Sequence, residues 1–229
     1  MSVTLSNVLP WGRSLDEYRR LFDLSEEDLQ TAILGCGDGP ASFNAELSEM
    51  GRSVVSIDPI YAFSREEIEL RIEETREAII SQVKQKLDNY VWEYFEGPED
   101  LVRHRLKCMR KFLNDYTAGL AQGRYSAQAL PSLSFHDQQF DLALCSHLLF
   151  LYSDQLSFDF HRDSIRELCR VAKEVRIFPL LALDCRRSPH VEPILEHFAG
   201  EGYDIEVCVV PYEFQKGGNC MMRVRPTRE

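Results

Sequence analysis

The stretch that most restricts the fold is TAILGCGDGPASF at residues 31–43, where a short apolar run breaks into alternating glycines. The run from Thr31 to Leu34 is too short for a helix and ends at glycine, which is typical of a buried strand that enters a tight turn. Pro40 suits the first position of a following helix. The sequence RSVVSI at 52–57 then predicts a second strand, so the segment indicates a strand, helix, strand unit.

The same alternation continues toward the C-terminus. The sequence predicts strands at Phe140–Ser146 and Glu174–Leu180 with a helix from Phe158 to Ala172 between them. A helix at 189–199 follows, then strands at 205–211 and 220–225 joined through the turn KGGN, and so short a connection requires an antiparallel pair. We therefore expect an α/β fold with a doubly wound, mostly parallel, Rossmann-like sheet whose last strand is antiparallel.

Two helical segments lie outside this alternation. Ser64 and Glu67 have capping-box spacing and start an apolar stripe that predicts a helix to about residue 95. After Gly97-Pro98 a second stripe runs to Leu120, so residues 64–120 are expected to form an inserted α-helical hairpin. The hairpin could be a packing element and homodimer surface, or a lid over a substrate. An N-terminal helical arm spans 9–30, and we expect 1–229 to form a single domain.

The composition of the chain limits the classes of partner that we expect it to bind. The 229 residues carry a formal net charge of −11, which disfavours nucleic acid as a partner. No apolar stretch approaches the roughly 20 residues that span a bilayer, and the N-terminus lacks the pattern of a secretory signal, so we expect a cytoplasmic protein without a membrane partner. Seven cysteines without a C-x-x-C pair, and histidines without ligand spacing, indicate free thiols and no metal site.

Glycines in the first turn of such a sheet let a ligand approach the backbone. The dinucleotide fingerprint G-x-G-x-x-G would place a small residue at position 40, where Pro40 stands. The pattern present, G-x-G-x-G, resembles motif I of the class I S-adenosylmethionine-dependent methyltransferases. Asp58 ends the second strand, where an acidic side chain can bind ribose hydroxyls, and LSFHDQQFDLALCSH at 133–147 looks like a further family segment. Together with the reversed last strand, the resemblance covers about residues 31–58 and 125–225.

The resemblance implies S-adenosyl-L-methionine as the cofactor and a set of residues that would bind it. They are Gly35, Cys36, Gly37, Asp38, Gly39, Asp58, Pro59, Leu130, Cys145, Ser146 and His147, with Arg13 and Tyr18 from the arm. Ile33 stands where many members carry an acid that holds the methionine end, so another group must bind the cofactor's ammonium. Ala129 replaces an aspartate that often bonds adenine, which leaves the amide of Leu130 as the base contact.

The expected activity is methyl transfer to a small molecule. His147 is the candidate general base, and the alternative is that it lines the cofactor pocket or bonds to backbone. Tyr152, Asp154 and His161 follow on the same crossover and are equally compatible with loop, cap or surface roles. Two other functions stay open: an NAD(P)-dependent oxidoreductase, and a non-catalytic interaction protein that binds S-adenosylmethionine.

Overall fold

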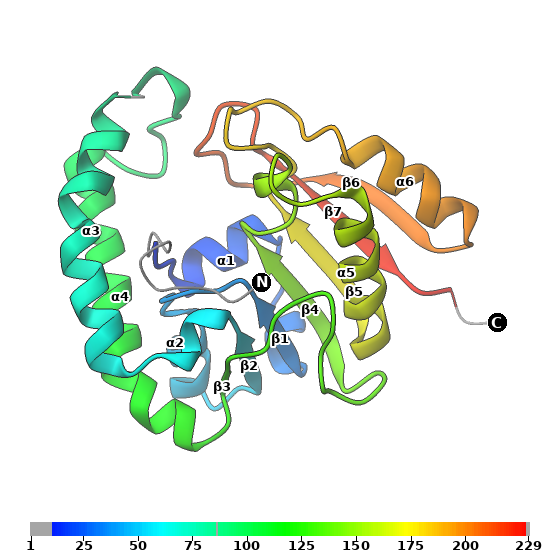
Figure 1. The fold of residues 1–229 in the computed structure, drawn as a ribbon, viewed down its shortest axis with the longest axis horizontal. Coiled ribbons are helices and arrows are strands. Elements are labelled where there is room, and N and C mark those ends of the chain that lie inside the picture. Colours follow the sequence, from blue (N-terminus) through cyan, green and yellow to red (C-terminus); the bar gives the residue numbers. More distant parts are fainter. Residues whose placement is uncertain (1–10, 86, 228–229) are drawn as a thin grey trace.

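The computed structural model describes residues 11–85 and 87–227, which build one seven-stranded sheet flanked by helices (Figure 1). The strand order is β3-β2-β1-β4-β5-β7-β6, and β7 is antiparallel to both of its neighbours. All the other pairs are parallel. The strands are β1 Ile33–Cys36, β2 Val54–Ile57, β3 Tyr125–Ser126, β4 Phe140–Ser146, β5 Ala172–Phe178, β6 Asp204–Val209 and β7 Cys220–Arg225. The expected α/β fold with a reversed last strand is confirmed.

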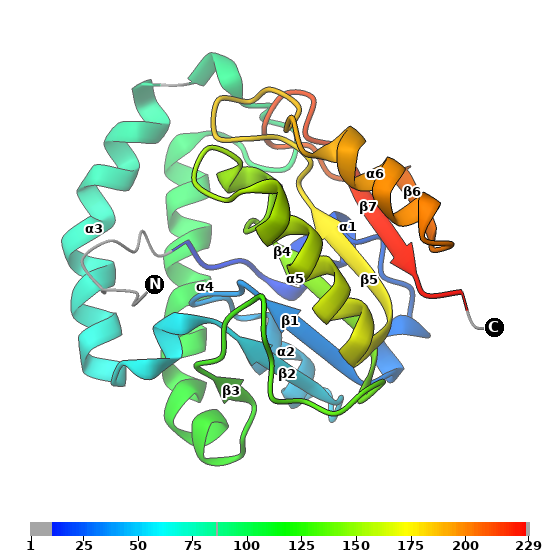
Figure 2. The same cartoon turned by 45° about the vertical axis from the view of Figure 1, so that its right-hand side comes forward.

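Helices cover both faces of the sheet because successive strand residues point to opposite sides. Leu142 and Leu144 of β4 pack in a cluster with α1 (Leu15–Leu21) and α2 (Phe43–Glu49). Ala143 and Cys145, the alternate residues, pack in a second cluster with α5 (Phe158–Val171) and α6 (Val191–Gly200). Figure 2 shows α5 and α6 in front of the strands. The sheet is therefore buried in the middle of three layers.

The hairpin lies beyond the β3 edge of the sheet, at the left of Figure 1. It consists of α3 (Arg65–Gln85) and α4 (Pro98–Ala121), which run antiparallel, since Arg65 donates to the Leu113 carbonyl at one end and Lys84 pairs with Glu99 at the other. The expectation that the first helix reaches about residue 95 is wrong. A 3₁₀ turn, η4 (Leu87–Asn89), follows the helix, and Tyr90 then pairs with Gln215 of the loop between β6 and β7.

Other boundaries also differ from the sequence-based expectation. Pro40 is not in a helix, because the amide of Ser42 bonds to the Arg13 carbonyl at 2.9 Å and α2 begins only at Phe43. Strand β3 has two residues and showed no apolar pattern of its own. The 3₁₀ helices η2 (Asp28–Gln30), η3 (Pro59–Ala62) and η5 (Phe150–Tyr152) complete the chain. Helix α1 begins with a capping box, in which Ser14 and Glu17 form reciprocal hydrogen bonds at a spacing that is readable in the sequence.

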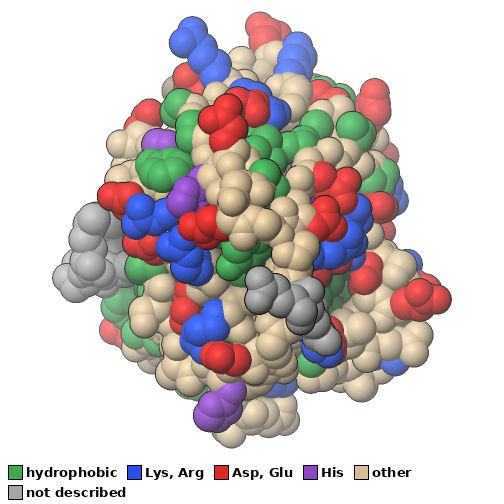
Figure 3. Space-filling view, turned by 90° about the vertical axis from the view of Figure 1, so that its right-hand side faces the viewer, with side chains coloured by type: hydrophobic (Ala, Val, Ile, Leu, Met, Phe, Trp, Pro, Cys, Tyr) green, Lys and Arg blue, Asp and Glu red, His purple; other side chains and the backbone are tan. Residues whose placement is uncertain are grey.

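On the face at the β6 edge, acidic and basic side chains lie scattered among hydrophobic and uncharged ones (Figure 3). Ion pairs across β6 and β7 contribute to this pattern, among them Arg225 with Asp204 at 3.3 Å. Charged side chains on an edge strand oppose pairing with another sheet. Within residues 11–85 and 87–227, every helix is too short or too polar to span a bilayer.

Candidate functional site

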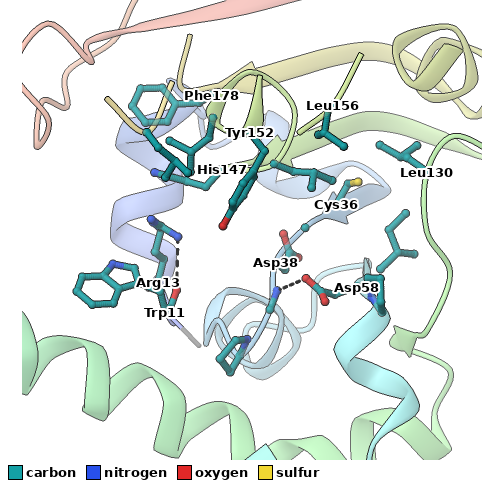
Figure 4. A pocket seen from close by; sticks show the side chains of 18 of the residues that line it. Trp11, Arg13, Cys36, Asp38, Asp58, Leu130, His147, Tyr152, Leu156 and Phe178 are labelled. Carbon is teal, nitrogen blue, oxygen red and sulfur yellow. Dashed lines mark hydrogen bonds between the residues drawn. The ribbon is translucent and has the colours of Figure 1, made fainter. Parts of the chain in front are cut away.

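A cavity of about 660 Å³ opens at the carboxyl ends of β1, β2 and β4, the place where ligands bind in doubly wound sheets (Figure 4). Among the residues expected to bind the cofactor, those that line it are Arg13, Cys36, Gly37, Asp38, Gly39, Asp58, Pro59, Leu130 and His147. Four others, Gly35, Tyr18, Cys145 and Ser146, are not part of the lining. Cys145 and Ser146 are buried in β4, and a hydrogen bond between the free thiols of Cys145 and Cys36, together with burial, raises the pKa of Cys36.

The glycines of the first turn are required for two different structural reasons, space at one position and backbone conformation at two others. A Cβ atom on Gly35 would lie 2.0 Å from Oδ2 of Asp38, so the missing side chain makes room for that carboxylate. Gly37 and Gly39 have φ angles of +73° and +52°, which residues with side chains rarely adopt. The side chain of Asp38 therefore folds back against the turn, into the space that Gly35 leaves open.

Asp38 is almost fully buried, and its carboxylate connects the glycine turn to α1 and to β2. Its Oδ1 accepts a hydrogen bond of 2.7 Å from the Tyr18 hydroxyl, and its Oδ2 accepts one of 2.6 Å from Ser56. Burial raises the pKa of Asp38 to about 7, although the two hydrogen bonds act in the opposite direction. The Asp38 carboxyl therefore lies at the cavity wall with a charge that changes near neutral pH. Tyr18 was expected to contact the cofactor directly, whereas the structure places it behind Asp38.

Asp58 follows β2 and faces the glycine turn (Figure 4). Its Oδ2 accepts a hydrogen bond of 2.9 Å from the amide of Gly39, and its Oδ1 accepts one of 2.9 Å from Ile60. Burial raises its pKa, while these two amides lower it. A carboxylate has about four lone-pair sites, so both oxygens can still accept a bond from a ligand hydroxyl.

Arg13 reaches the cavity from the N-terminal arm, next to Trp11 (Figure 4). One Nη donates to the Trp11 carbonyl at 3.4 Å, and the buried Nε has no hydrogen-bond partner. Burial and the nearby charge of Arg105 lower the pKa of Arg13 to about 10, so it stays charged at neutral pH. Within the described part of the chain, no ion pair joins Arg13 to a carboxylate.

Glu17, an acid whose charge acts on Arg13, forms its ion pairs with other residues. Its carboxylate is fully buried and lies 2.6 Å from Arg105 and 3.0 Å from His104. Burial alone would raise the pKa of Glu17, but Arg105 and His104 hold it at about 2. Hydrogen bonds to Cys108 and Glu17 raise the pKa of His104 to about 9. Glu17, His104 and Cys108 bring three possible ligand atoms within 4.8 Å of one another, and in the structure Glu17 pairs with His104 and Arg105.

His147 directly follows β4 and has a positive φ of 51°. Its Nδ1 lies 3.0 Å from the Ser146 hydroxyl, and its ring packs 5.4 Å from Phe178. Burial, with the charges of Arg13 and Arg105, lowers its pKa well below the usual range. His147 is therefore neutral at pH 7 and a weaker base than a free imidazole.

The tip of the hairpin and the β6–β7 loop close the outer side of the cavity. We call this contact, formed by residues 89–91 and 214–216, the junction. The amide of Val91 donates to the Phe214 carbonyl at 2.8 Å, and the amide of Lys216 donates to the Asn89 carbonyl at 3.0 Å. The rings of Tyr90 and Phe214 stack with centroids 4.5 Å apart. Figure 1 shows these two segments approaching each other above the sheet.

Much of the cavity lining was not predicted from the sequence. The residues concerned are Val83, Tyr90, Leu156, Phe160, Phe178, Leu183, Tyr212, Phe214, Gln215 and Gly218. The only signal was the cluster of aromatic residues just before KGGN. Of the crossover candidates, Tyr152 lines the cavity, Asp154 is exposed, and His161 is buried with its ring 5.3 Å from that of Phe150.

Comparisons with known proteins bear on the family and the fold. No family model matches the chain. The uncharacterized protein MJ0045 of Methanocaldococcus jannaschii is 31% identical over 224 residues, which cover 97% of this chain and 98% of that protein. Among solved structures, the bifunctional kinase-methyltransferase WbdD aligns with a TM-score of 0.50 and 13% identity over 92% of this chain and 40% of that one.

Magnesium protoporphyrin IX methyltransferase (ChlM) from Synechocystis PCC 6803, with bound S-adenosylmethionine, aligns with a TM-score of 0.48 and 12% identity, covering 93% of this chain and 78% of that one. The sheet order and the reversed β7 match the topology expected from the resemblance. The chain therefore has the class I methyltransferase fold and belongs to the same family as the M. jannaschii protein MJ0045.

Proposed function

We propose that this protein is an S-adenosylmethionine-dependent methyltransferase that acts on a small molecule. The observation that carries the proposal is the meeting of three complementary groups in one cavity: the ribose-type acid Asp58, the glycine-rich turn, and the unpaired cation Arg13. They come from separate parts of the sequence and fit the ribose, the backbone approach and the carboxylate of one amino acid nucleoside.

We assign the polar ends of the cofactor as follows. Asp58 accepts hydrogen bonds from the ribose hydroxyls, and Arg13 pairs with the carboxylate. Asp38 supplies the negative charge for the ammonium, because Ile33 is buried in the apolar core and has none to offer. Leu130, Cys36 and Pro59 lie at the part of the wall that suits the adenine.

The chemistry would rest on position and on exclusion of water. Methyl transfer is an in-line displacement at the methyl carbon of the sulfonium, so a site that aligns donor and acceptor can supply much of the acceleration. The low pKa of His147 makes it a poor proton acceptor. We therefore assign His147 to orienting the reactants rather than to general base catalysis.

The hairpin would shape the acceptor site as part of one domain. The support is the junction, which links its tip to the β6–β7 loop by two backbone hydrogen bonds and places Val83 and Tyr90 in the cavity wall. Tyr90→Ala removes the ring that the hairpin contributes to the cavity wall and leaves Arg105 of α4 in place, so lowered activity with retained cofactor affinity is the expected result. Retained activity would assign the hairpin to packing or to a dimer surface.

The direct test is turnover. The purified protein is incubated with S-adenosylmethionine labelled in the methyl group and a metabolite library, and label transferred to a library member is measured. At a cofactor concentration near the wild-type Kd, Asp58→Ala should strongly reduce transfer, and Asp154→Ala, at an exposed aspartate outside the cavity, should retain it. Binding of S-adenosylmethionine without transfer to any acceptor would favour the interaction protein, and selective binding of NAD(P) would favour the oxidoreductase.

A further inference from the structure

We propose that the methyl acceptor is a flat aromatic molecule of one or two rings that reacts through an anionic oxygen, a phenolate or a carboxylate. This inference rests on the proposed function and names its substrate class. The structural basis is the half of the cavity on the far side of His147 from Asp58, which we call the acceptor chamber.

The walls of the acceptor chamber are largely aromatic. The ring centroids of His147 and Phe178 are 5.4 Å apart, and those of Phe178 and Tyr212 are 6.1 Å apart. The stacked pair of Tyr90 and Phe214 closes the outer end. Aromatic side chains favour flat ligands, which they contact by stacking or edge to face. The rings are fixed in place, since Phe178 and Tyr212 are buried and the junction holds the other two.

More positive than negative side chains surround the acceptor chamber. Arg13 lines it without an ion pair, and Arg105 and His104 lie directly behind, with Glu17 as the single acid of that network. The only carboxylates in the cavity lining, among residues 11–85 and 87–227, are Asp38 of the glycine turn and Asp58, which follows β2 and accepts a hydrogen bond from that turn. Three cations against one buried anion exceed what one cofactor carboxylate neutralises. This field attracts an anionic acceptor and repels a protonated amine.

An anionic oxygen also fits the lack of a strong base. Its lone pair attacks the methyl carbon of S-adenosylmethionine, the O–CH₃ bond forms as the S–CH₃ bond breaks, and the bonding electrons stay on sulfur. The sulfonium and the oxyanion become a neutral thioether and a neutral ether or ester, so no proton has to move. An alcohol, or an ordinary phenol with a pKa of about 10, is neutral at pH 7 and would instead need a base, a role for which the depressed pKa of His147 is unsuited. The phenolates concerned are therefore those of acidic phenols, which are already ionised at pH 7.

Size sets the limit of one or two rings. Small-molecule sites commonly measure about 300–1,000 Å³. This cavity of about 660 Å³ has to hold the cofactor and the acceptor together. The exposed side chains of Leu183 and Tyr152 belong to the lining and mark where it meets solvent.

The test measures binding of two probes of the same shape and opposite charge to protein saturated with S-adenosylhomocysteine. The probes are 2-naphthoate and 2-naphthylmethylamine, titrated at pH 7 by calorimetry. We expect naphthoate to bind at least about tenfold more tightly than the amine. Phe214→Ala should weaken naphthoate about tenfold by removing a wall of the chamber. Phe158→Ala removes an equally half-buried phenylalanine outside the cavity and should leave the affinity unchanged.

The affinity for S-adenosylhomocysteine shows that each variant is folded. Equal binding of the two probes, absence of naphthoate binding, or equal effects of the two phenylalanine variants would each overturn the inference while the cofactor still binds. Failure of S-adenosylhomocysteine to bind the wild-type protein would overturn the proposed function itself, and the two failures are thereby distinguished.

Discussion

The hydroxyl of Tyr18 donates a hydrogen bond of 2.7 Å to the carboxylate of Asp38, and so ties the N-terminal arm to the glycine-rich turn. Gly35 provides the space for that carboxylate, and Ser56 supplies its second donor. Burial places the pKa of Asp38 at about 7, which leaves it about half charged at neutral pH. A cation that approaches Asp38 will favour its ionised form.

Cofactor binding should therefore release a proton from Asp38. The ammonium of S-adenosylhomocysteine lowers the pKa of Asp38, so the protein releases a proton on binding at pH 7, where Asp38 is partly protonated, and releases less at pH 8, where Asp38 is mostly ionised. Calorimetry in phosphate and in Tris, which differ in ionisation enthalpy, measures the protons released. Asp38→Asn should abolish the difference between the buffers at pH 7. A difference that persists in this variant would assign the proton to another group.

Arg13→Lys should separate the two ends of the cofactor. Lysine keeps the charge but cannot form the bidentate pair, so affinity for S-adenosylhomocysteine is expected to fall about tenfold while that for adenosine is unchanged. Arg186→Lys, on an exposed arginine, is the matched control. Fluorescence titration with both ligands measures the effect, and an equal loss for both would mean that Arg13 supports the fold rather than the carboxylate.

Glu17→Gln should destabilise the protein by about 3–5 kcal/mol, because it leaves Arg105 buried without its anion. Glu26→Gln, in the exposed pair with Arg19, should cost less than about 1 kcal/mol. Urea unfolding gives both values. The folded pKa of Glu17 is lowered to about 2, so its contribution is complete above about pH 4.5 and is lost as the pH falls toward 2. A small loss, close to that of the Glu26 variant, would show that Arg105 finds another partner.

The parts of the fold that local patterns encode were predictable. Strands β4 and β7 have the predicted bounds because each is a short run with clear ends, and the capping box located α1. Strand β3 was missed, since two residues have no periodicity to recognise. The first helix of the hairpin ends early because Tyr90 stacks on Phe214, a partner more than 120 residues away that no local pattern indicates.

The candidate site divides in the same way. The glycine turn and Asp58 form a motif that is visible in the sequence, and the structure places both at the cavity. The surroundings of Arg13 could not be predicted, because they depend on Arg105 of α4 taking the carboxylate of Glu17. The aromatic walls come from the end of β5, from the β6–β7 loop and from the tip of the hairpin, so their meeting is a product of tertiary structure.

Asp58 provides the most direct test of the proposed cofactor site. Calorimetric titration of S-adenosylhomocysteine into the wild-type protein should show one site per chain. Asp58→Ala should weaken binding by about 10- to 150-fold, the loss expected when charge-assisted hydrogen bonds to the ribose are removed. Asp154→Ala, outside the cavity, should bind like the wild type. Absence of binding to the wild type, or an unchanged affinity of a folded Asp58→Ala variant, would contradict the account.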